Sequence, residues 1–193
     1  MKVAIIKYNA GNIHSVRLAL NRIGVEPIVS DDPSIIAQAD KVIFPGVGEA
    51  RSAMKYLKSR NIDNLLPKLT QPLLGICLGL QLMCRDSEEN NTTCLGIFDA
   101  KVKMFPAKKK IPHMGWNTIY DFKSSLFEKI DRNSYVYFVH SYYAELNTNT
   151  SAQSNYIVTF SSALHRNNFY AVQFHPEKSG KVGEKILKNF LSL

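Results

Sequence analysis

The chain has 193 residues, of which 45% are hydrophobic and 21% are charged. A chain of this size buries a core without disulfides or metal, so we expect a single domain over residues 1–193. No apolar run approaches the ~18 residues of a membrane span, and residues 1–7 are too polar for a signal peptide. We therefore expect a cytoplasmic protein that does not bind membranes.

Charge and cysteine content exclude further classes. The net charge is +8, but the lysines are scattered apart from residues 108–110 and lack interleaved aromatic residues. This pattern favours a basic surface suited to an acidic partner protein over nucleic-acid binding. Cys77, Cys84 and Cys94 form no C-x-x-C pair, so neither a disulfide framework nor a metal site is expected.

Short apolar strands alternate with helical patterns in the first half of the chain, which predicts a parallel sheet wrapped by helices. A first helix should end at Gly24, a second should follow Gly48, and a third should run from Val182 to Leu191. The polar residues 86–93 and 146–155 are expected to be surface loops or hairpin connections. The expected strands are residues 3–8, 26–29, 41–44, 72–76, 135–139, 157–160 and 169–174.

The sequence Gly-Ile-Cys-Leu-Gly at residues 75–79 links an apolar strand to a helical pattern. Glycines on both sides of Cys77 are typical of a nucleophile elbow, in which a sharp turn exposes the reactive atom at the carboxyl end of the sheet. A helix N-terminus also stabilises a thiolate. The alternative interpretation, a buried small hydrophobic residue, applies to most lone cysteines and is favoured for Cys84 and Cys94.

His-Pro-Glu at residues 175–177 follows the last expected strand. In extended backbone, residues two apart project to the same side, so His175 and Glu177 are a candidate base and its orienting carboxylate. A histidine after a strand is often incidental, but beside an elbow cysteine the pair predicts nucleophilic catalysis. The glycine turn at residues 44–48, Phe-Pro-Gly-Val-Gly, is either a tight strand-to-helix turn or a set of amides that binds an oxyanion.

These three motifs, in this order, resemble the class I glutamine amidotransferase family over essentially the whole chain. Residues 8–12, 112–117, 138–142 and 175–179 resemble the glutaminase subunits of imidazole glycerol phosphate synthases. The resemblance implies a flavodoxin-like α/β fold with a mostly parallel central sheet flanked by helices. It also implies that the chain hydrolyses L-glutamine without a cofactor and forms a heterodimer with a (βα)8-barrel cyclase, which uses the ammonia for histidine biosynthesis.

The resemblance also implies roles for individual residues. The catalytic residues are Cys77, His175 and Glu177, and the oxyanion donors are the amides of Val47 and Leu78. The implied substrate-binding residues are Gly46, Gly48, Gln81, His140, Ser141 and Tyr142. The implied partner-facing residues are Asn12, His113, Met114, Trp116 and Asn117. Lys7, Glu49 and Ala50 depart from the residues common in the family, and none of them belongs to the triad.

Three alternatives remain open at this point. One is a paralogous subunit that supplies ammonia to a different synthase, for example in surface-sugar biosynthesis. Another is a regulatory scaffold that keeps the fold without the activity, although the intact triad residues oppose it. The third is a cysteine peptidase on a similar sheet, which Gln81 and the spacing of His175 and Glu177 disfavour.

Overall fold

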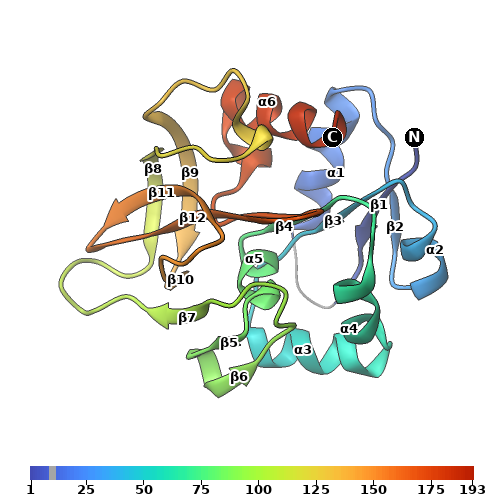
Figure 1. Cartoon of the computed structure of the whole chain (residues 1–193), viewed down its shortest axis with the longest axis horizontal. Coiled ribbons are helices and arrows are strands. Elements are labelled where there is room, and N and C mark those ends of the chain that lie inside the picture. The colour runs from blue at the N-terminus through green and yellow to red at the C-terminus, as the bar shows by residue number, and fades with distance from the viewer. Residues whose placement is uncertain (9–11) are drawn as a thin grey trace.

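The computed structural model describes residues 1–8 and 12–193 of the protein. Its centre is a block of five parallel strands (Figure 1). Apolar residues of this block are buried on both of its faces. The order across this block is β2 (Ile28–Ser30), β1 (Val3–Ile6), β3 (Lys41–Phe44), β4 (Leu73–Ile76) and β13 (Phe169–Val172).

Beyond β13 the sheet continues with mainly antiparallel pairing. The further strands are β12 (Val158–Arg166), β11 (Thr150–Tyr156), β10 (Tyr142–Ala144), β7 (Lys101–Met104), β5 (Asp86–Ser87) and β6 (Thr92–Thr93). A separate antiparallel ribbon pairs β8 (His113–Ile119) with β9 (Ser134–His140).

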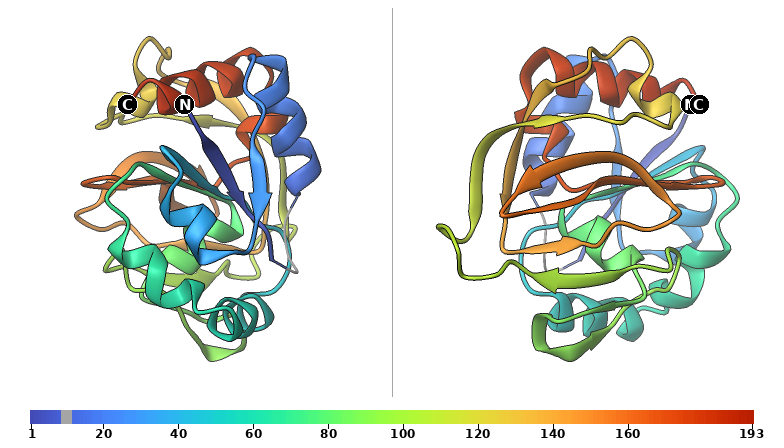
Figure 2. Two further views of the ribbon diagram at one scale, coloured as in Figure 1. Left: turned by 90° about the vertical axis from the view of Figure 1, so that its right-hand side faces the viewer. Right: turned by 60° about the vertical axis from the view of Figure 1, so that its left-hand side comes forward.

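Helices cover both faces of the parallel block (Figures 1 and 2). Successive residues of β1 point to opposite faces, so Val3 and Ile5 join one apolar core while Ala4 and Ile6 join the other. The first core contains residues of α1 (Ile13–Arg22), α6 (Gly180–Leu191) and the β8–β9 ribbon. The second contains residues of α2 (Pro33–Ala37), α3 (Ala50–Ser59), α4 (Ile62–Leu65) and α5 (Leu78–Met83).

The predicted fold class is confirmed, but one expected loop is wrong. Residues 150–156, which overlap the polar segment 146–155, form strand β11 instead of a surface connection. Two of its buried hydroxyl groups make hydrogen bonds: Thr150 Oγ1 lies 2.7 Å from Ser161 Oγ, and Ser154 Oγ donates to Thr118 O at 2.7 Å. A strand whose inward side chains are small and polar shows no hydrophobic alternation, which explains the wrong prediction.

The other polar segment, residues 86–93, forms the short hairpin of β5 and β6 around a 3₁₀ turn, η2 (Glu89–Asn91). This agrees with the expected hairpin connection. Within the described residues, every helix is too short or too polar to cross a membrane.

Candidate active site

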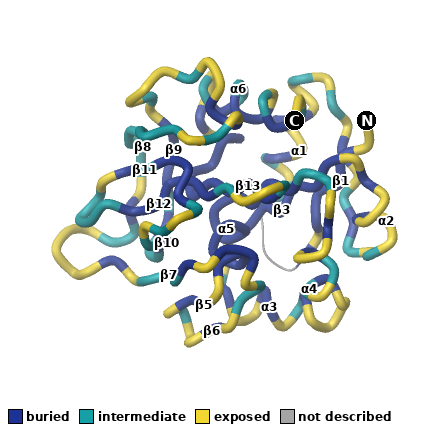
Figure 3. Tube along the Cα trace, in the orientation of Figure 1, coloured by how far each residue is buried: buried dark blue, intermediate teal, exposed yellow. Residues whose placement is uncertain are grey.

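Cys77 occupies a strained turn between β4 and α5. Its backbone has φ +54° and ψ −106°, a conformation that residues with a side chain rarely adopt. The flanking glycines permit this turn to pack closely. A Cβ atom on Gly79 would lie 2.0 Å from the carbonyl oxygen of Phe44, and one on Gly75 would lie 2.6 Å from Met83 Sδ. The expected elbow is therefore present, and α5 behind it is buried along its whole length (Figure 3).

The strand that carries the histidine lies next to the strand that carries the cysteine. Ile76 of β4 pairs with Val172 of β13, and the Cys77 amide donates to Val172 O at 2.8 Å. His175 follows three residues after Val172, and its own amide donates to Tyr137 O at 2.9 Å. The sheet register thus brings two segments far apart in sequence to the same edge of the sheet.

His175 and Glu177 form a buried pair, with 2.8 Å between His175 Nδ1 and Glu177 Oε1. Both side chains are about 1% exposed. Because Nδ1 is engaged by the carboxylate, Nε2 is the nitrogen left for proton transfer, and it has no hydrogen-bond partner among the described residues. This is the arrangement of a general base held by an orienting acid.

Opposing effects set the pKa of His175. Burial by itself would lower the pKa, but attraction to the charge of Cys77 and the hydrogen bond to Glu177 outweigh it and raise the pKa to about 10. The imidazolium is therefore the favoured form at neutral pH. A cation beside the thiol favours the thiolate, which is the nucleophilic form of cysteine.

Tyr8 contacts the glycine turn, because its hydroxyl donates a hydrogen bond to the carbonyl oxygen of Pro45. The Leu78 amide donates to Gly46 O at 3.2 Å, so this expected oxyanion donor is engaged within the protein. Val47 is 40% exposed, and Gly48 has φ +127°, a value that strains any residue with a side chain.

A cavity of about 280 Å³ opens above the elbow. It is lined by Val47, Gly48, Cys77, Leu78, Gln81, Glu89, Val139, His140, Ser141 and Tyr142. Seven of these ten are residues predicted for the oxyanion or for substrate, and Cys77 is the predicted nucleophile. Gly46 is the exception. It is buried and does not line the cavity, and a Cβ atom added to it would lie 2.3 Å from the Tyr8 hydroxyl, so its role in binding substrate stays a prediction.

Sequence reasoning did not identify Glu89 or Val139 as cavity residues. Glu89 belongs to the η2 turn, and its carboxylate accepts a hydrogen bond from the Ala50 amide at 2.8 Å. Burial raises the pKa of Glu89, against the lowering effect of that hydrogen bond. No motif surrounds this glutamate, and only the folding of the β5–β6 hairpin against α3 brings it to the cavity.

The residues expected to face a partner divide into two groups. Met114 and Trp116 are 61% and 56% exposed, and Asn12 and Asn117 are half-buried. The side chain of His113 is buried at 4% exposure, which contradicts the expectation that it lies on the partner-facing surface. It alternates with Met114 along β8 and so points inward. Residues 9–11 of the same expected motif lie outside the described residues.

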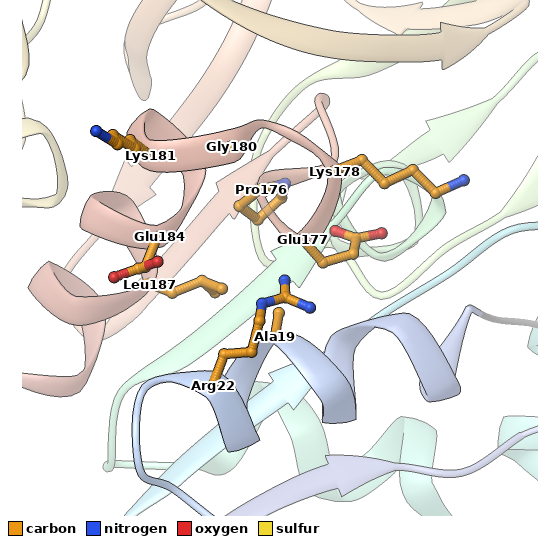
Figure 4. Close-up of a pocket in the computed structure, with 9 residues that line it drawn as sticks. All are labelled: Ala19, Arg22, Pro176, Glu177, Lys178, Gly180, Lys181, Glu184 and Leu187. Carbon is orange, nitrogen blue, oxygen red and sulfur yellow. The ribbon is translucent and has the colours of Figure 1, made fainter.

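A second hollow of about 360 Å³ is lined by residues of α1, α6 and the segment 176–178 (Figure 4). Its lining includes Glu177 and the charged side chains of Arg22, Lys178, Lys181 and Glu184. The nucleophile is not among its lining residues. The cavity over Cys77 is therefore the candidate substrate site.

Comparisons with known proteins agree with this geometry. A family described as "Glutamine amidotransferase class-I" matches residues 4–193. The chain belongs to the class I glutamine amidotransferase family. It is 60% identical to "Imidazole glycerol phosphate synthase subunit HisH" of Bacteroides fragilis and 47% identical to the protein of the same name in Escherichia coli. Both alignments cover 100% of this chain and of the relative.

Solved structures of the family share the fold. A structure titled "Crystal structure of glutamine amidotransferase" has a TM-score of 0.78 at 18% identity and covers 100% of this chain and 98% of its own. A glutamine amidotransferase from Thermotoga maritima has a TM-score of 0.65 at 17% identity, with coverage of 100% and 83%. At these identities the likeness concerns the fold alone.

Proposed function

We propose that this chain is the glutaminase subunit of an imidazole glycerol phosphate synthase, which hydrolyses L-glutamine to glutamate and ammonia. The observation that carries the proposal is the buried His175–Glu177 pair beside the elbow cysteine, on a chain whose full-length relatives bear that subunit's name. The single glutaminase domain over residues 1–193 and the cytoplasmic location remain predictions from the sequence.

The chemistry follows from the positions of the three groups. Cys77 attacks the side-chain amide carbon of glutamine as a thiolate, and the imidazolium of His175 gives its proton to the departing ammonia. The same imidazole then takes a proton from water, which hydrolyses the γ-glutamyl thioester to glutamate. Glu177 holds the ring so that Nε2 faces the reaction, and it stabilises the cation.

Glu89 suits the amino-acid end of glutamine. It is the only acidic side chain among the described residues that line the cavity over Cys77. A carboxylate there attracts the α-ammonium of an amino acid and leaves the side-chain amide to reach the thiol. Gly48, Gln81, His140, Ser141 and Tyr142 are proposed to surround the rest of the substrate.

The proposed partner is a (βα)8-barrel cyclase that consumes the ammonia, in a heterodimer. Met114 and Trp116 present apolar surface on β8, and an exposed tryptophan is typical of an interface anchor. Asn12 and Asn117 are proposed to border this surface. The net charge of +8 favours association with an acidic face of the partner.

The alternatives have weaker support. Relatives from several organisms carry the same subunit name at 47–60% identity over their full length, which favours the histidine-pathway subunit over one that supplies another synthase. The match to the amidotransferase family disfavours a peptidase. The paired His175 and Glu177 would have no function in an inactive scaffold.

The decisive experiment measures glutamate release from glutamine by the purified chain, alone and with the barrel cyclase of the same organism and its nucleotide ligand. We expect a large stimulation that Cys77→Ala abolishes and that Cys94→Ala, which changes a thiol outside the cavity, leaves intact. If a cyclase that is active with free ammonia fails to stimulate the chain, the acceptor is a different synthase.

A further inference from the structure

A buried side-chain amide lies against the nucleophile. Gln173 Nε2 donates to Cys77 Sγ at 3.6 Å, a normal distance for a hydrogen bond to sulfur. Gln173 is completely buried and directly follows Val172, which pairs with the strand that leads to the cysteine. Its amide is therefore shielded from water, where a hydrogen bond to an anion is strongest.

The orientation of this amide is fixed by a second glutamine. Gln81 Nε2 donates to Gln173 Oε1 at 3.2 Å, so the oxygen of Gln173 faces Gln81 and its nitrogen must face the sulfur. Gln81 also donates to the carbonyl oxygen of Tyr142 at 2.9 Å. Gln81 thus uses its amide nitrogen within the protein and is itself 5% exposed.

A buried histidine pair continues the chain of hydrogen bonds. His140 Nδ1 lies 2.7 Å from the same Tyr142 oxygen, and His140 Nε2 lies 2.9 Å from His113 Nδ1. His113 Nε2 lies 3.3 Å from Asn117 Nδ2. Asn117 in turn is half-buried and projects to the same face of β8 as His113, opposite to Trp116.

The protons on these two rings have a single consistent placement. The Tyr142 carbonyl only accepts, so His140 carries its proton on Nδ1 and its Nε2 accepts from His113 Nδ1. The other nitrogen of His113 is then an acceptor for the Asn117 amide. Burial lowers the pKa of His113 to about 4 and that of His140 to about 3, so both rings stay neutral, as this pattern requires.

Packing keeps the rings in place. His113 stacks between Tyr156 and Phe138, with ring centroids 4.1 Å and 4.9 Å away. Its position therefore depends little on the hydrogen bonds alone. Replacing the ring by a phenyl group would keep the stack and remove both nitrogen atoms.

We infer that Gln173 is a further catalytic residue, which stabilises the Cys77 thiolate, and that a relay of Gln81, His140, His113 and Asn117 positions its amide. The relay connects the nucleophile to the surface of β8. This inference rests on the proposed function in one respect, namely that Cys77 is the nucleophile. The histidines and Asn117 are positioning residues, because they act on the sulfur through other groups.

The test is the pH dependence of Cys77 alkylation by iodoacetamide in the full chain, followed by mass spectrometry of the peptide that contains Cys77. In Gln173→Met the donor is lost at similar volume, and the pH of half-maximal labelling should rise by about one unit. Gln173→Glu keeps the oxygen that faces Gln81 but loses the N–H donor. In this variant the pH of half-maximal labelling should rise at least as much as in Gln173→Met. In His113→Phe and Asn117→Ala the pH of half-maximal labelling should also rise, but by a smaller amount.

Thr118→Val is the matched control, because it changes a side chain of β8 beside Asn117 and keeps the backbone amide that donates to Asn117 Oδ1 at 2.8 Å. Its labelling should follow the wild type. Thermal unfolding of each variant verifies that it is folded. Wild-type labelling in both Gln173 variants would overturn the inference, and a shift in Gln173→Met with none in His113→Phe would overturn the relay. Labelling needs no glutamine, so a chain that behaves as expected here but releases no glutamate counts against the proposed function alone.

Discussion

The Leu78 amide donates a hydrogen bond to the carbonyl oxygen of Gly46, 3.2 Å away. This amide is one of the two proposed oxyanion donors, so in the present conformation it is directed at the protein instead of the cavity. Removal of one oxyanion donor typically lowers kcat about 10²–10³-fold. If Leu78 is an oxyanion donor, the glycine turn has to rearrange before the site reaches full activity, and we propose that binding of the partner causes this change.

The first prediction concerns a glutamine analogue with an aldehyde in place of the side-chain amide, which forms a tetrahedral adduct with a thiol. We expect it to bind the complex with liganded cyclase about a hundredfold more tightly than the chain alone, because only the rearranged turn stabilises the adduct. Inhibition constants measured on both forms test this. Equal constants would show that the oxyanion donors are already in place in the free chain.

The second prediction concerns Tyr8, whose hydroxyl holds the Pro45 carbonyl under the glycine turn. Tyr8→Phe removes this hydrogen bond at nearly constant shape, so the turn rearranges more easily. We expect glutamate release by the chain alone to rise about fivefold, since a hydrogen bond contributes about 1 kcal/mol. Tyr56→Phe is the control, because it loses a comparable bond to Asp31 (2.6 Å) far from the cavity and should leave turnover unchanged.

The third prediction concerns alkaline pH. Burial opposes the charge of His175, but its pKa is nonetheless raised from 6.5 to about 10, chiefly by attraction to Cys77. A raised pKa stabilises the fold fully below pH 6.5, and this contribution is lost as the pH rises toward 10. Urea unfolding should therefore show a larger loss of stability between these values in the wild type than in Cys77→Ala. If both proteins lose the same amount of stability over this pH range, attraction to Cys77 does not raise the pKa of His175.

The fourth prediction concerns Glu49, which departs from the usual family residue. Its carboxylate accepts from the amides of Arg51 and Ser52 at the start of α3 and from Asn90 Nδ2 at 2.7 Å. The hydrogen bond from Asn90 is the largest cause that lowers its pKa to about 2. Glu49→Ala should lower the free energy of unfolding by about 1 kcal/mol at neutral pH.

Because the pKa of Glu49 is depressed, this difference should be complete above pH 4.5 and disappear as the pH falls toward 2. Chemical unfolding at neutral and acidic pH measures both quantities. Glu26→Ala is the control, because its exposed carboxylate makes only a loose ion pair, with Oε1 3.8 Å from Nη2 of Arg17, and its loss should change stability little. A loss of stability that persists at the lowest pH would exclude the charge of Glu49 as its cause.

The fifth prediction concerns Gly79. An added Cβ would lie 2.0 Å from the carbonyl oxygen and 3.1 Å from the carbonyl carbon of Phe44, which are backbone atoms that cannot easily shift. Gly79→Ala should destabilise the fold by about 4 kcal/mol or more and abolish activity. Gly24→Ala has nothing within 4 Å of the new atom and a φ of +82°, so it should cost only about 1 kcal/mol. Similar midpoints of thermal unfolding for the two variants would contradict this account.

The sequence predicted the parts of the site that are encoded locally. Cys77, His175 and Glu177 belong to short motifs whose residue types and spacing indicate nucleophilic catalysis. Strand β3 was predicted at its observed bounds because the apolar run of residues 42–44 lies between Lys41 and the glycine turn that begins with Pro45. The fold class followed from the alternation of such runs with helical patterns.

What the sequence did not predict depends on contacts between distant segments. Gln173 meets Cys77 only through the pairing of β13 with β4, and Glu89 reaches the cavity only through the β5–β6 hairpin. The inward position of His113 follows from which face of β8 packs on the core. The sequence concealed it because the apolar residues Met114 and Trp116 face outward while the polar His113 faces inward. The close packing of Gly46 against Tyr8 and Leu78 also joins segments that are distant in the sequence.

The place of β13 in the sheet has a consequence for folding. β13 lies between β4 and β12, yet it follows both of them in the chain. Until β13 inserts, β4 lacks its partner on that side, and Cys77 has neither its base nor the amide of Gln173 beside it. A chain folded only as far as β12 therefore carries an unactivated thiol, and the reactive centre arises in the same step that joins the two parts of the sheet.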